Sequence, residues 1–197
     1  MTRVWIGLLG AALALGGCAG GPTASGGFRE PGQVEQSGAG IYRLTPEDRG
    51  RVQFRMLDGI NALRQARGTA PLALDPALIA AAETHSRDMA LQNRPWHFGS
   101  DGSSPLDRVA RAGYPGSLVG EAISETYESE IETLTAWMED DGSAAVVLDP
   151  AARQMGIGWF QQQDGKLWWT LVTGRPGAAG PGGAGGAGGA FGPIAGL

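Results

Sequence analysis

The sequence predicts a small α+β domain, and three observations support this prediction. Apolar residues first recur at helical spacing, residues that favour helix starts stand before these stretches, and an alternating apolar pattern with a turn signal comes last. The helices precede the strands instead of alternating with them. We therefore expect helices packed on a small antiparallel sheet, within residues 41 to 174.

Capping residues and prolines predict the first two helices. Thr45 is a good N-cap and Pro46 fits the first helical position, while Gly68 ends the pattern. A second helix is predicted to start at Asp75-Pro76 and to stop before Pro95. The stripes that face the core are Val52, Met56, Ile60 and Leu63 in the first helix, and Leu78, Ala82, His85 and Met89 in the second.

Two shorter helices follow. Ser104 opens one that closes at Gly113, and Ser129 with Glu132 forms a capping box for the other. The acidic run 139–141 ends the latter helix against its dipole, and we interpret it as a solvated turn, with a cation-attracting rim as the alternative. In that helix the predicted core face carries Ile131, Leu134 and Met138, flanked by Trp137.

A hairpin completes the domain. Met155, Ile157 and Trp159 alternate with other residues, Asp164-Gly165 is a turn signal, and residues 167–172 return. Alternation places Trp168 and Trp169 on opposite faces, so we expect at least one of them in the core. The alternative is that exposed tryptophans form a platform for carbohydrate.

The ends of the chain differ from the domain in composition. Residues 1–17 carry Arg3 and a short apolar run, which is typical of a signal peptide. Residues 18–42 are predicted to be a flexible linker, 43–174 the domain, and 175–197 a Gly-rich disordered tail. The net charge of −5 and the absence of a basic stripe argue against a nucleic-acid partner.

The stretch Leu15-Gly16-Gly17-Cys18 resembles the lipobox of bacterial lipoproteins. This resemblance implies that Cys18, the only cysteine of the chain, carries a lipid anchor and is the first residue of the mature protein. Ala19 implies sorting to the outer membrane, with the domain in the cell envelope facing the periplasm. The alternative is an ordinary secretory signal peptide, which leaves an exposed free thiol.

Residues 61–173 resemble the CAP superfamily, also called the SCP domain, in its compact bacterial branch. The matching stretches, in chain order, are Ile60-Asn61-Ala62-Leu63-Arg64, Pro71-Leu72, His85-Ser86-Arg87-Asp88-Met89-Ala90, His97-Phe98-Gly99-Ser100-Asp101-Gly102, Asp107-Arg108, Ala112-Gly113-Tyr114, Gly120-Glu121, Trp137-Met138 and Met155-Gly156-Ile157-Gly158. The resemblance implies a three-layer α-β-α sandwich around a small antiparallel sheet, with a cleft on one side.

The resemblance also implies a cleft tetrad of two histidines and two acids, which binds a divalent metal in some members. His97 and Glu121 match one histidine and one acid, and Asp140 matches the second acid. Ser143 stands in place of the second histidine, and Ala122 replaces the asparagine that follows the glutamate. A serine hydroxyl is a poor zinc ligand, so we expect at most weak metal binding and no required cofactor.

We therefore interpret His97 and Glu121 as a hydrogen-bonded polar pair, and His85 as a core histidine. The favoured function is a non-enzymatic module that binds a lipid, glycan or protein of the envelope. The alternatives are a metal-assisted hydrolase with Glu121 as base and His97 as ligand, and a purely structural protein. A serine nucleophile beside His97, at Ser100, Ser103 or Ser143, lacks the Gly-x-Ser-x-Gly elbow.

Overall fold

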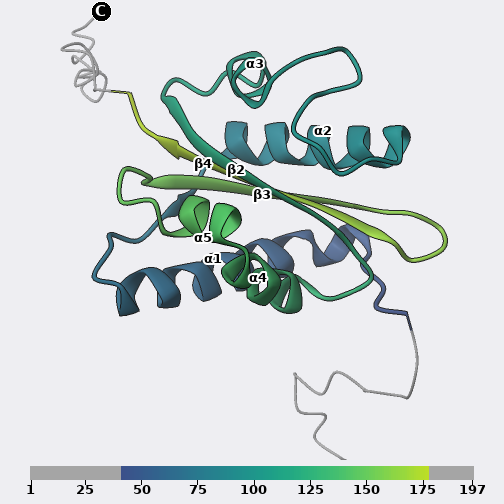
Figure 1. Ribbon diagram of the computed structural model, residues 1–197, viewed down its shortest axis with the longest axis horizontal. Coiled ribbons are helices and arrows are strands. Elements are labelled where there is room, and N and C mark those ends of the chain that lie inside the picture. The colour runs from purple at the N-terminus through teal and green to yellow at the C-terminus, as the bar shows by residue number, and fades with distance from the viewer. Residues whose placement is uncertain (1–40, 178–197) are drawn as a thin grey trace, which may run out of the picture. The chain divides into compact units, whose positions relative to one another are not determined.

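The computed structural model describes residues 41–177 (Figure 1). The predicted signal peptide, Cys18, most of the linker and most of the Gly-rich tail lie outside the described residues. The elements, in chain order, are η1 (Pro46–Asp48), α1 (Arg49–Ala66), β1 (Ala73–Leu74), α2 (Pro76–Gln92), α3 (Pro105–Arg111), β2 (Ser117–Thr126), α4 (Glu130–Glu139), α5 (Asp141–Leu148), β3 (Gln154–Gln161) and β4 (Leu167–Arg175). No helix among residues 41–177 is long and apolar enough to cross a membrane.

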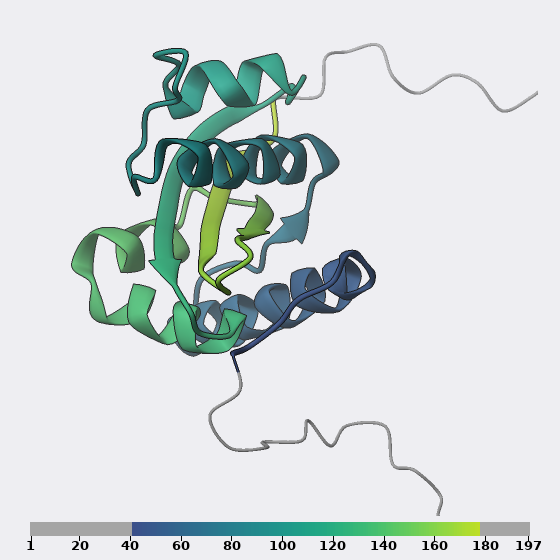
Figure 2. The same cartoon turned by 90° about the vertical axis from the view of Figure 1, so that its right-hand side faces the viewer.

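The strands form one sheet in the order β1-β3-β4-β2, and helices cover both of its faces. Strand β4 pairs antiparallel with β2 on one side and with β3 on the other, while β1 adds a two-residue parallel pairing to β3. Helices α2 and α3 lie on one face, and α1, α4 and α5 lie on the other (Figures 1 and 2). The predicted α+β class and three-layer architecture are confirmed.

The two adjacent tryptophans of β4 pack on opposite faces of the sheet. Trp168 packs with Met89 and Ala90 of α2, whereas Trp169 belongs to the larger core with α1 and α4. Both side chains are fully buried. The prediction from alternation is correct, and a carbohydrate platform made by these two rings is ruled out because neither reaches solvent.

Two glycines of β3 let helix α2 press directly on the sheet. A Cβ atom on Gly156 would stand 2.1 Å from the backbone of Leu78, and one on Gly158 would stand 2.2 Å from the backbone of Glu83. Real Cβ atoms do not approach a backbone so closely, so any larger residue would push the helix away. The same close packing fixes the distance between the sheet and α2, the helix that carries His85.

A buried arginine fastens helix α1 to the end of α5. The Arg64 side chain is fully buried and donates to the carbonyls of Ala70, Val147, Asp149 and Ala152. Burial lowers the pKa of Arg64. Its guanidinium satisfies carbonyls that a helix end leaves without partners, so the charge takes part in closing the layer of α1, α4 and α5.

The sequence analysis did not predict three elements, β1, β2 and α5. Strand β2 contains Gly120 and four acids or serines on exposed or partly exposed positions, which obscures a period of two. The acidic run is also more than a turn, because Asp140 ends α4 and caps α5. In α4 the face that packs on the core differs from the predicted face. Trp137, predicted to flank the core, is buried, whereas Ile131, predicted to face it, is 36% exposed.

Replacing Gly156 with alanine is expected to destabilise the domain by about 1–3 kcal/mol or more, because its Cβ would overlap the backbone of α2. The matched control is Gly50→Ala in α1, where nothing lies within 4 Å of the new atom. This control should be neutral or stabilising by up to about 1 kcal/mol, through helix propensity. Urea denaturation measures both, and equal stability of the two variants would refute the close approach.

Candidate binding cleft

Strand β2 and the loop after α2 bring the predicted pair together. Glu121 lies on β2, the edge strand, and His97 lies on the loop that follows α2. Because successive strand residues point to opposite faces, Glu121 points to the side of α2 and α3, and Ala122 points into the core with α4 and α5. The imidazole Nδ1 of His97 lies 2.9 Å from Oε1 of Glu121.

The carboxylate of Glu121 also forms a bidentate ion pair with Arg108 of α3. One guanidinium nitrogen donates to both oxygens, at 2.9 Å and 2.7 Å, and another donates to the carbonyl of Ser103. The Glu121 side chain is 3% exposed and that of Arg108 is 5% exposed. Buried groups of opposite charge at this distance fix each other's orientation.

Arg108 is the main site residue that the sequence analysis missed. Its signal was present as Asp107-Arg108, one of the matching stretches, but a lone arginine on a short helix is usually exposed. The capping box of α3, in which Ser104 and Asp107 form reciprocal hydrogen bonds, fixes the start of the helix that carries Arg108. Only the fold shows that this helix points the guanidinium at β2.

His85 is buried, as predicted, but it also lies beside the site. Its Nε2 donates to the carbonyl of Trp96 at 3.0 Å and stands 3.7 Å from Oε1 of Glu121. Burial lowers the pKa of His85, so the neutral ring is favoured, while the nearby Glu121 acts in the opposite direction. Its Nδ1 is buried and has no hydrogen-bond partner among the described residues.

Hydrogen bonds to α2 hold the loop that carries His97. Helix α2 ends at Asn93, which adopts the left-handed conformation. The indole of Trp96 donates to the side chain of Gln92, and the backbone N–H of Ser100 donates to Asp88. The His97 ring itself is half exposed, so the site combines a buried acid with an imidazole that reaches solvent.

Asp140 and Ser143 do not bond to this pair. The carboxylate of Asp140 accepts the backbone N–H of Ser143 at 2.8 Å and so caps α5. That hydrogen bond lowers the pKa of Asp140. Helix α5 belongs to the layer on the other face of the sheet, and neither residue has a hydrogen bond or ion pair to His97 or Glu121 in the described part of the chain.

The donor set fits a tightly bound metal ion poorly. Both oxygens of Glu121 are held by Arg108, and the His85 nitrogen that faces Glu121 carries a proton donated to a carbonyl. A cation at Glu121 would have to displace a guanidinium that is itself buried. Within residues 41–177, no group of three or more His, Cys, Asp or Glu side chains is arranged to hold a metal.

The structure does not support the serine-nucleophile alternative either. Within the described residues, His97 has no hydrogen bond to the hydroxyl of Ser100, Ser103 or Ser143. Its one recorded partner is Glu121. A nucleophile needs an adjacent base, so these serines lack the contact that would activate them.

The helical layers, the small sheet and the Glu121 site define a protein of the CAP class. The model of the cysteine-rich secretory protein family, CAP, matches residues 57–173, which is more than half of the chain. The chain therefore belongs to this family. The YkwD protein of Bacillus subtilis (strain 168) is 29% identical over 114 residues, covering 58% of this chain and 44% of that relative.

Solved structures share the fold. An extracellular SCP-domain protein of Bacillus anthracis str. Ames superposes with a TM-score of 0.60 at 22% identity, over 68% of this chain and 45% of that one. An outer surface protein of Borrelia burgdorferi also gives a TM-score of 0.60, at 16% identity, over 68% of this chain and 97% of that one. The chain spans less than half the length of the first two relatives, YkwD and the B. anthracis protein.

Replacing Arg108 with methionine should cost about 3–5 kcal/mol of stability, because Glu121 would remain buried without its counter-charge. The double variant Arg108→Met with Glu121→Gln should recover part of this loss. Arg111→Met is the matched control, since its ion pair with Asp101 is exposed and should contribute under about 1 kcal/mol. Chemical denaturation measures all three, and equal losses at the two arginines would contradict a buried pair.

Proposed function

We propose that this chain is a lipid-anchored CAP domain of the bacterial cell envelope that works as a binding module without chemistry of its own. The observation that carries this proposal is that the carboxylate of Glu121 is buried, with Arg108 at both oxygens and His97 at Oε1. A base or a metal ligand needs an accessible lone pair, and here both oxygens already have partners within the protein. The half-exposed His97 is the group of this site that a ligand would meet.

Two lines of support favour the envelope. The lipobox-like stretch ending at Cys18 supports lipid anchoring, and Ala19 supports placement in the outer membrane facing the periplasm. The structural neighbours include an extracellular protein and an outer surface protein, in agreement with a secreted or surface location. We propose that the ligand is a lipid, glycan or protein of the envelope, bound by contact with the cleft.

The hydrolase alternative requires Glu121 to act as base and His97 as metal ligand. In that case Arg108 would have to release the carboxylate before any cation could bind. Zinc affinity therefore separates the two proposals, because a binding module of this type does not need the metal.

Calorimetric titration of the unmodified chain with zinc should show weak binding at most, because one half-exposed imidazole and an occupied carboxylate make a poor ligand set. Ser143→His should leave this affinity unchanged, as should Ser143→Ala, because residue 143 lies on α5, on the other face of the sheet from Glu121. Tight one-to-one zinc binding by the unmodified chain would favour the hydrolase and refute our proposal.

Anchoring is tested by replacing Cys18 with serine in the full chain, expressed in a Gram-negative host. The unmodified protein should incorporate labelled palmitate and partition into the detergent phase of Triton X-114, since several acyl chains suffice for stable anchoring. Cys18→Ser should abolish both properties, and Ser37→Ala, in the predicted linker, should change neither. Retention of Cys18→Ser in the detergent phase would contradict a lipid anchor at this residue.

A further inference from the structure

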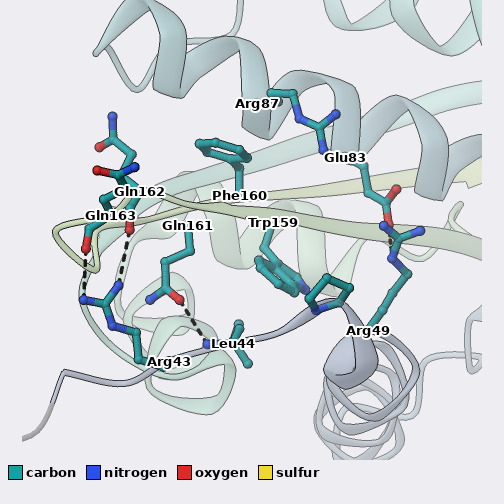
Figure 3. Close-up of a pocket in the computed structure, with 11 residues that line it drawn as sticks. Arg43, Leu44, Arg49, Glu83, Arg87, Trp159, Phe160, Gln161, Gln162 and Gln163 are labelled. Atoms are coloured by element: carbon teal, nitrogen blue, oxygen red, sulfur yellow. Dashed lines mark hydrogen bonds and ion pairs between the residues drawn. The ribbon is translucent and has the colours of Figure 1, made fainter.

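The predicted linker joins the described domain at the turn between β3 and β4. A Cβ atom on Gly165 of this turn would overlap the side chain of Ile41, so Ile41 packs directly on the turn. Arg43 donates to two carbonyls of the turn, and the backbone N–H of Leu44 donates to a side chain at the end of β3 (Figure 3). These contacts hold residues 41–44 at the turn.

A buried carboxylate also holds this segment. The hydroxyl of Tyr42 donates to Glu130 of α4 at 2.6 Å, and Glu130, which is fully buried, pairs with Arg55 of α1 at 2.8 Å. Burial and, after it, the contact with Glu130 raise the pKa of Tyr42 to about 12, so the hydroxyl can donate at neutral pH. The point at which the linker meets the domain is therefore fixed in the fold.

Exposed apolar side chains lie at the same end of the sheet. Ile41 is 50% exposed, and so is Tyr127, at 51%, whose hydroxyl lies 3.5 Å from a carboxylate oxygen of Asp164 in the turn. Helix α2 also ends here, because its last turns pack on Trp168 at the start of β4 (Figure 1). In the last turn of α2, Leu91 is 80% exposed.

A cation without a counter-charge follows directly after α2. Arg94 is exposed, and its backbone N–H donates to the carbonyl of Met89 in the last turns of the helix. Its guanidinium lies over the ring of Trp96 at 3.7 Å and forms no ion pair within residues 41–177. The hairpin-end surface is defined here as Ile41, Leu91, Arg94 and Tyr127.

The position of this surface beside the linker distinguishes it, because single exposed apolar residues are normal on a protein. Between Cys18 and Ile41 lie 22 residues, whose composition predicts a flexible chain with a root-mean-square length of about 26 Å. With a lipid on Cys18, the bilayer stays within reach of the surface, at an effective concentration of roughly millimolar order. Weak affinity for lipid is enough for docking under these conditions.

We infer that the hairpin-end surface docks on the phospholipid bilayer that carries the lipid anchor. Its three apolar side chains would enter the boundary between headgroups and acyl chains, and Arg94 would meet the phosphates. Docking would also hold the cleft of His97 near the bilayer, because His97 lies in the same loop as Arg94. The inference rests on the proposed function, because it needs the anchor at Cys18.

The test places a fluorescent probe at the turn between β3 and β4 of the lipidated full chain. Cys18 is the only cysteine, and the lipid blocks its thiol, so Gln163→Cys supplies one reactive thiol for a nitrobenzoxadiazole label at an exposed position. In phosphatidylglycerol vesicles, doxyl-labelled lipid should quench this probe. Ala151→Cys, exposed just before β3 at the other end of the sheet, is the matched position, where quenching should be several times weaker.

Substitutions within the surface should release the domain from the bilayer. Leu91→Ser combined with Arg94→Gln should lower the docking constant, measured from quenching at residue 163, by about fivefold or more, since one arginine near an anionic surface alone accounts for about this factor. Leu106→Ser combined with Arg67→Gln is the matched control, because it removes the same two groups from exposed positions elsewhere and should leave docking unchanged. Circular dichroism checks that both variants fold.

The outcomes separate this inference from the proposed function. A chain that floats with the vesicles but shows equal quenching at both probe positions, or equal effects of the two double variants, would overturn the inference and leave the anchor intact. A chain that does not float with vesicles has no anchor, and would refute the proposed function together with the inference. Dimerisation without lipid that is lost on Leu91→Ser would assign the surface to a second copy and would also overturn the inference.

Discussion

The close contact between α2 and β3 is the constraint on which the Glu121 site depends. Gly156 and Gly158 leave no side chain between strand and helix, so α2 rests on the backbone of the sheet. This position places His85 beside Glu121 on one flank and carries the loop of His97 to the same carboxylate. On the other flank Glu83 and Arg87 of α2 line a pocket together with Trp159 and Phe160 of β3.

Ionic contacts then tie the outer elements to this frame, each in a different way. Arg108 neutralises the buried carboxylate of Glu121, whereas Arg64 donates to four backbone carbonyls and pairs with no carboxylate among residues 41–177. Arg87 differs from both, because it is exposed and rests on an aromatic ring. A buried arginine with satisfied donors holds the structure together, and an exposed one without a counter-charge is available to a ligand.

The counter-charge of Glu121 belongs to the chain itself. Arg108 donates to both oxygens of the carboxylate, at 2.9 Å and 2.7 Å. The site offers solvent the half-exposed ring of His97. This arrangement agrees with a module that recognises a ligand by contact.

The sequence alone determined the helix starts, the hairpin, the α+β class and the meeting of His97 with Glu121, the last through the family resemblance. Capping residues such as Ser104 and Ser129 act within one turn of chain, so local sequence is enough to locate them. The tertiary structure alone decided that Arg108 meets Glu121, that His85 lies beside it, and that β1 pairs with β3 over only two residues. Each of these depends on contacts between residues distant in the chain, and no local pattern encodes which partner a charged side chain or a strand edge will meet.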